Sequence, residues 1–185
     1  KLRVWLGTSN LDSVAPPTDI PGIHTGSRAA IRDFNNDGKL DVVVLDTLMF
    51  LRVYWNSGTA QTPSFTSPET IYAGDLGQVD DRTCPFFVDW NHDGLQDMVL
   101  GGNYWAHCGA QSGYHRLYLN TGTAENPKYG LGKWIRFKTN NSSTSVAPWV
   151  DNQTRWSGIS APVVADFNND TYPDLVSICD AAAWS

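Results

Sequence analysis

The sequence predicts an all-β protein built from repeated four-stranded units. A nine-residue pattern, Asp-x-Asn-x-Asp-x-x-x-Asp, occurs at residues 33–41, 89–97 and 166–174. A short apolar stretch precedes each copy, and a short run rich in β-branched residues follows it. Runs of this length and composition are typical of buried strands and not of helices. The repeated pattern therefore marks a turn between two strands, used three times.

The remaining elements of the unit follow in a fixed order. After the second strand comes an alternating segment that ends in a turn, at residues 51–58 and 116–122. The sequence Gly-Thr-Ala-x-x-Pro then occurs at residues 58–63 and 122–127 and leads toward a fourth strand. Because the same classes of residue recur in the same order, the repeat defines one structural unit of four strands.

The unit boundaries predict one repeat region over residues 1–185. Residues 2–8 align with the third strand of the unit, so the chain opens and closes half-way through a unit. We expect the halves at opposite ends to be able to complete each other. The predicted parts are a half unit at 1–26, whole units at 27–81 and 82–158, and a half unit at 159–185.

The Asp-rich turns are predicted to bind up to three structural calcium ions. Side-chain oxygens at positions 1, 3, 5 and 9, with the backbone carbonyl at position 7, suit a hard cation that takes about six to eight oxygen ligands. Magnesium keeps several of its waters, so an all-protein oxygen cage favours calcium. The predicted ligands are Asp33, Asn35, Asp37, Lys39, Asp41, Asp89, Asn91, Asp93, Leu95, Asp97, Asp166, Asn168, Asp170, Tyr172 and Asp174.

Positions 6 and 12 distinguish these loops from EF-hands and from one another. An EF-hand requires Glu at position 12, and position 12 is not acidic in any copy. Position 6 turns sharply, which suits Gly38 and Gly94, whereas the third copy has the β-branched Thr171. We therefore expect the third site to be either the weakest or differently shaped. His92, at a non-ligating position, is expected to face solvent.

Charge agrees with metal sites more than with a basic partner. The net charge is −6, and nine of the 19 acidic residues lie in the three loops, so three divalent ions would balance it. Asp-Asn-Asp-Gly clusters also occur as ordinary solvated turns, but three copies at one spacing favour metal binding. The chain has no basic patch to suit nucleic acid and no 18-residue apolar run to suit a membrane span.

The loops, their flanking strands and the following Asn-x-Gly-Thr turn resemble the FG-GAP and VCBS repeats of β-propellers. Integrin α-subunit heads, certain lectins and some polysaccharide lyases contain such repeats. The resemblance implies that each unit is a four-stranded blade and that the fifteen loop positions are calcium ligands. About three blades are too few for a closed propeller of about four to eight. We expect part of a larger propeller, with a ring closed by identical copies as the alternative.

Several features predict a secreted or cell-surface glycoprotein. Loop calcium sites of this kind fill at the high calcium levels outside cells. Sequons for glycosylation occur at Asn140, Asn141, Asn152 and Asn169.

The three cysteines cannot all pair within the chain. Cys84 begins a first strand and Cys108 lies between the second and third strands of the same unit, so antiparallel threading puts both at one end. We predict a Cys84–Cys108 disulfide, with two free thiols as the alternative. Cys179 is left without a predicted partner.

The second unit carries two insertions, which are expected to emerge on the face away from calcium. Aromatic side chains on enlarged loops can stack on sugar rings, although they also fill gaps between blades. The candidate ligand-binding residues are Tyr104, Trp105, His107, Tyr114, Trp149 and Trp156.

The sequence favours a non-enzymatic role. No catalytic residues are predicted, because His107 and His115, the one candidate acid/base pair, have no third partner in the sequence. We expect an adhesion, assembly or structural module that binds an extracellular protein or glycan, or the remaining blades of the same or another chain. A lectin-like, carbohydrate-binding propeller and a polysaccharide lyase are the alternatives.

Overall fold

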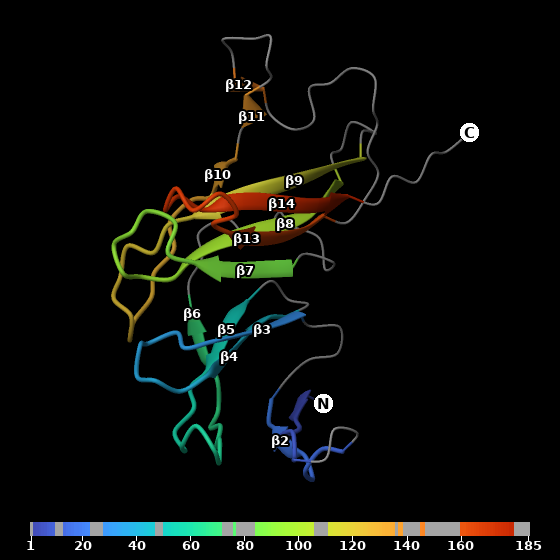
Figure 1. The fold of residues 1–185 in the computed structure, drawn as a ribbon, viewed down its shortest axis with the longest axis vertical. Coiled ribbons are helices and arrows are strands. Elements are labelled where there is room, and N and C mark those ends of the chain that lie inside the picture. The colour runs from blue at the N-terminus through green and yellow to red at the C-terminus, as the bar shows by residue number, and fades with distance from the viewer. Residues whose placement is uncertain are drawn as a thin grey trace, which may run out of the picture.

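The computed structural model describes most of the chain as antiparallel strands joined by turns (Figure 1). No α-helix occurs within the described ranges. The predicted all-β class is therefore confirmed. The described residues are 2–9, 13–22, 28–46, 50–71, 76, 84–105, 111–135, 137–138, 145–146 and 160–179.

Two four-stranded antiparallel sheets form the centre of the molecule, each with its strands in chain order. In both sheets an Asp-rich loop joins the first strand to the second, as the repeat predicts. The first sheet contains β3 (Arg28–Arg32), β4 (Asp41–Leu45), β5 (Leu51–Tyr54) and β6 (Glu69–Ile71). The second contains β7 (Cys84–Val88), β8 (Asp97–Trp105), β9 (Gln111–Tyr118) and β10 (Lys133–Trp134).

Two-stranded sheets lie on either side of this pair. β1 (Leu2–Val4) pairs with β2 (Thr18–Ile20), and a further bridge joins Gly7 to Val14. An equivalent bridge joins Asn56 to Phe65 in the first blade, after the third strand of that blade. By this correspondence, β1 and β2 occupy the places of a third and a fourth strand. β13 (Ser160–Ala165) and β14 (Asp174–Cys179) flank the third Asp-rich loop and occupy the places of a first and a second strand.

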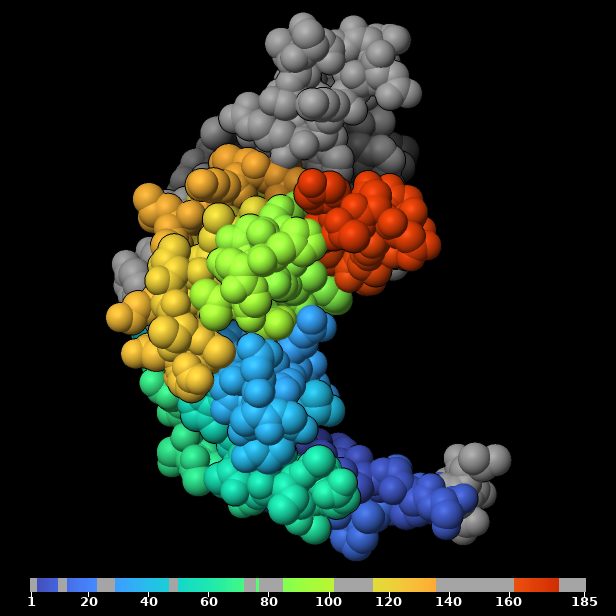
Figure 2. Space-filling model, turned by 60° about the vertical axis from the view of Figure 1, so that its left-hand side comes forward, coloured from blue at the N-terminus to red at the C-terminus, as the bar shows by residue number. Residues whose placement is uncertain are grey.

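The blades pack face to face and follow one another along an arc (Figure 2). One face of the first blade, including Val43 and Leu51, packs against Phe87 and Met98 of the second blade, and all four are buried. Each such side chain contributes about 1.5–3 kcal/mol when fully buried. β13 lies against β7 and β8 on the other face of the second blade.

Part of the second blade's first insertion lengthens strands. β8 has nine residues and β9 eight, against five and four for β4 and β5. Tyr104 pairs with Ser112 and Trp105 with Gln111 in this extension. These aromatic residues, with Tyr114, therefore lie on paired strands and not in the enlarged loop that the sequence predicts. A short pair, β11 (Phe137–Lys138) and β12 (Ser145–Val146), was also not predicted.

Candidate metal centres

The three Asp-rich loops lie on the same side of the molecule (Figure 1). Each follows the first strand of its blade, so the blades present the loops side by side. Contacts between loops confirm this placement: Asn36 Nδ2 of the first loop donates to the Gly94 carbonyl of the second at 3.4 Å. The His92 ring of the second loop meets the Tyr172 ring of the third edge to face, 6.0 Å between centroids. His92 is exposed, as predicted, but it also bridges two blades.

The carboxylate at position 1 folds its own loop. Asp33 Oδ1 accepts the backbone N–H of Asp37 at 3.0 Å, and Asp33 Oδ2 accepts that of Gly38 at 2.8 Å. Asp89 and Asp166 accept the corresponding two N–H groups in the second and third loops. Because every oxygen of a carboxylate has two lone pairs, each of these oxygens retains one for another partner.

Positions 3 and 5 are linked in the same way in all three loops. Asn35 Nδ2 donates to Asp37 Oδ2 at 3.2 Å, and Asp37 Oδ1 accepts the backbone N–H of Lys39 at 2.9 Å. In the second and third loops, the Asn at position 3 likewise donates to the Asp at position 5, which also accepts the backbone N–H of position 7. The amide oxygen of each Asn accepts the backbone N–H of the Asp at position 5, at 3.2 Å, 3.2 Å and 3.0 Å in the three loops.

The carboxylate at position 9 ties the loop to the end of the third strand. Asp41 is fully buried; its Oδ2 accepts the N–H of Phe34 at 3.0 Å and its Oδ1 that of Asn56 at 2.8 Å. Asp97 makes the same pair of bonds to Trp90 and Asn120. Burial raises the pKa of both carboxyls, while these backbone hydrogen bonds act in the opposite direction.

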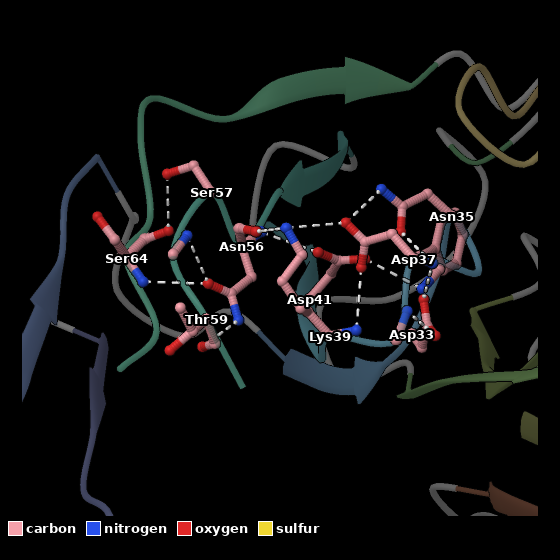
Figure 3. Close-up of polar contacts among 12 residues, drawn as sticks. Asp33, Asn35, Asp37, Lys39, Asp41, Asn56, Ser57, Thr59 and Ser64 are labelled. Atoms are coloured by element: carbon pink, nitrogen blue, oxygen red, sulfur yellow. Dashed lines mark hydrogen bonds and ion pairs between the residues drawn. The ribbon is translucent and has the colours of Figure 1, made fainter. Parts of the chain in front are cut away.

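Asn56 and Asn120 hold the turn that receives this carboxylate, and sequence reasoning missed their role. Asn56 Oδ1 accepts the N–H groups of Gly58 at 3.0 Å and Ser64 at 3.1 Å (Figure 3). Asn120 Oδ1 accepts those of Gly122 and Lys128. The signal was present in the Asn-x-Gly-Thr sequence, which is typical of a turn closed by an Asn side chain.

The third loop has the same shape as the other two. Position 6 takes a positive φ of 82° at Gly38, 84° at Gly94 and 75° at Thr171. A β-branched residue is strained in that region, at a cost of about 1–3 kcal/mol. Of the two expectations for the third loop, a different shape is wrong, and weaker binding stays a prediction.

The loops provide oxygen donors only, which fits a hard cation such as calcium. In the described part of the chain, no three His, Cys, Asp or Glu side chains gather into a metal-binding group. The loop carboxylates are instead turned toward backbone N–H groups of their own loops. In the first loop, the ammonium of Lys39 lies 3.0 Å from Asp37 Oδ2.

Several predicted residues lie outside the described part of the chain, so their roles stay predictions. Asn169 is described: it is exposed at position 4 of the third loop, with a φ of 59°. Cys84 is the first residue of β7, paired with Gly101 in register. The residues outside the described ranges are His107, Cys108, Asn140, Asn141, Trp149, Asn152 and Trp156.

Four-stranded antiparallel blades, packed face to face with a loop of one kind on one side, define a β-propeller-like protein. Residues 33–100, from the first Asp-rich loop into β8, match the family model described as an FG-GAP-like repeat. This part of the chain is therefore an FG-GAP-like repeat, as the resemblance implied. Comparisons with curated proteins and with solved structures gave no match. Among the described residues, no helix has the length and apolarity needed to cross a membrane.

Proposed function

We propose that the chain is a calcium-stabilised β-propeller module that serves adhesion or assembly outside the cell. The observation that carries this proposal is the common hydrogen-bonding pattern of the three loops, which aligns the same oxygen donors in each. FG-GAP-like repeats occur typically in extracellular or surface proteins, which supports the compartment.

The donor set of each loop supports calcium over other cations. Two carboxylates and one amide oxygen come from positions 1, 3 and 5, and the position 7 carbonyl and the position 9 carboxylate complete the set. These are the ligand types that calcium takes in flexible loops. In the first loop the ion would be held by Asp33, Asn35, Asp37, the Lys39 carbonyl and Asp41.

Electrostatics explains why such an ion would stabilise the blades. Each loop places three carboxylates within nine residues, and the chain carries a net charge of −6. Carboxylates of like charge repel one another, and a divalent ion between them offsets the repulsion. Because the unfolded chain has no preformed site, binding favours the folded state, by about 2.7 kcal/mol per site when calcium is 100 times Kd.

The proposed adhesion role rests on the β-propeller-like fold and on the extracellular or surface location. The lectin alternative depends on aromatic residues outside the described ranges or on strands whose side chains are not described. No described contact favours that alternative or the lyase.

The test is the number of calcium ions bound per chain at equilibrium, measured by dialysis and elemental analysis. We expect three for the wild type and two for each of Asp37→Asn, Asp93→Asn and Asp170→Asn, because each removes one charged ligand. Glu125→Gln, an equal loss of charge at an exposed residue outside the loops, should leave three. A wild-type chain that binds no calcium would contradict the proposal.

A further inference from the structure

The first loop differs from the other two at position 7. It has Lys39 there, whereas the second loop has Leu95 and the third has Tyr172. The Lys39 ammonium donates to the Asn56 carbonyl at 2.9 Å and lies 3.0 Å from Asp37 Oδ2 (Figure 3). The side chain therefore reaches from the loop to the turn after β5. Neither Leu nor Tyr carries a positive charge to place there.

This contact changes the hydrogen bonding of one predicted ligand atom. Asp37 Oδ2 faces two donors, Asn35 Nδ2 at 3.2 Å and the Lys39 ammonium at 3.0 Å. The equivalent oxygens of Asp93 and Asp170 each accept a side-chain hydrogen bond from the Asn at position 3. With two donors, the lone pairs of Asp37 Oδ2 are both in use.

The Lys39 ammonium also places a positive charge in the first loop, where a bound metal ion would place one. The first loop has three carboxylates, as the others do, but Lys39 offsets one of these charges within the loop. Its second contact, to the Asn56 carbonyl, anchors it from the side of the turn. Asn56 in turn donates its N–H to Asp41, so Lys39, Asn56 and Asp41 link the loop to the third strand.

We propose that Lys39 is a built-in cation of the first loop, which holds the loop in shape without metal and lowers its affinity for calcium. The inference rests on the proposed function, that the loops bind calcium. For calcium to bind, the ammonium must leave Asp37 Oδ2 or stay beside an ion of like charge. Both routes oppose binding, and neither exists in the second loop. The second loop consequently fills at lower calcium than the first.

The effect is limited by solvent. The side chains of Lys39 and Asp37 are 27% and 33% exposed, so water screens the repulsion between the ammonium and the ion. At the effective dielectric of a surface site, we expect a change in calcium affinity of about tenfold.

The test exchanges the residues at position 7 and measures each loop alone by calorimetric titration with calcium. In a chain with Asp93→Asn and Asp170→Asn, only the first loop retains all its charged ligands, and Lys39→Leu should tighten its binding about tenfold. In a chain with Asp37→Asn and Asp170→Asn, Leu95→Lys should weaken binding by the second loop to a similar degree. Lys133→Leu, which removes the same charge at an exposed position in β10, should change neither.

Melting in chelator provides a second measurement that does not depend on bound metal. Lys39→Leu should melt at a lower temperature than the wild type without calcium, because the loop loses its tether to Asn56. Calcium binding with equal affinity in wild type and Lys39→Leu would overturn the role of Lys39 while leaving the calcium proposal intact. Failure of every variant and of the wild type to bind calcium would instead overturn the proposed function.

Discussion

The buried Asp41 carboxylate accepts the backbone N–H of Asn56 at 2.8 Å, fifteen residues along the chain. Asp41 lies at the end of the Asp-rich loop, and Asn56 begins the turn after the third strand. One bond therefore joins the proposed ion site to the turn after the third strand, at the same end of the blade. The same bond recurs between Asp97 and Asn120 at 2.7 Å. The loop and the blade are consequently expected to unfold together.

Removal of the position 9 carboxylate should destabilise a whole blade. Asp41→Ala leaves the N–H groups of Phe34 and Asn56 without their acceptor in a buried site. Each unsatisfied donor costs about 1–3 kcal/mol, so we expect a loss of about 2–6 kcal/mol in the free energy of unfolding. Urea denaturation of the variant and the wild type, with calcium chelated, measures this loss.

The matched control for this variant is Asp174→Ala in the third loop. Asp174 is partly exposed and accepts the N–H of Phe167 at 2.9 Å, and no second backbone bond to it is found within the described residues. Asp174→Ala should therefore lower the free energy of unfolding by less than Asp41→Ala does. Equal losses of unfolding free energy in the two variants would show that the bond between Asp41 and Asn56 adds nothing to stability.

The turn after the third strand should not tolerate a side chain at its glycine. A Cβ at Gly122 would collide with the Asn126 carbonyl oxygen and the Lys128 nitrogen, both of them backbone atoms. Gly122→Ala should therefore lower the free energy of unfolding by about 1–3 kcal/mol, the usual cost of overpacking. Gly130→Ala is the control, since a Cβ there has no neighbour within 4 Å. A melting temperature that falls equally in both variants would contradict this explanation.

Relief of strain in the third loop should strengthen that loop. Thr171 has a φ of 75°, which Gly adopts at little cost. Thr171→Gly should raise the free energy of unfolding by about 1 kcal/mol and tighten calcium binding at that loop. The reverse exchange, Gly94→Thr, should weaken the second loop by a similar amount. Calorimetric titration of both variants checks the pair, and an unchanged affinity in both would contradict the strain argument.

Stability should fall on acidification because of His115. The side chain is 3% exposed, and burial lowers its pKa to about 4, against an ordinary value of 6.5. The unfolded chain therefore binds a proton on His115 at a higher pH than the folded chain does. The stability that neutral His115 contributes is fully present above pH 6.5. It is lost as the pH falls toward 4, which lowers the free energy of unfolding by up to about 3 kcal/mol.

His115→Leu isolates the contribution of His115 to the pH dependence of stability. The free energy of unfolding of the variant, measured between pH 7 and pH 4, should decline less steeply than that of the wild type. Parallel curves would mean that His115 is protonated equally in the folded and unfolded chains.

The local parts of the fold could be predicted from sequence because their signals are local. Asp, Asn and Gly at fixed spacing specify the loops, and β-branched runs such as Val42–Leu45 specify the buried strands. The contact between Asp97 and Asn120 spans 23 residues, and no spacing rule predicts which N–H the carboxylate accepts. The extension of β8 and β9 was missed because its Gly-Gly-Asn sequence at residues 101–103 is more typical of a turn than of a strand.

Calcium bound in the three loops is expected to stabilise the blades. The most direct test is thermal unfolding of the wild-type chain with calcium and with excess chelator, with magnesium as the control for a general effect of divalent ions. We predict that calcium raises the melting temperature by several degrees or more over chelator, and that magnesium raises it much less. The same melting temperature in calcium and in chelator would show that calcium does not stabilise the blades.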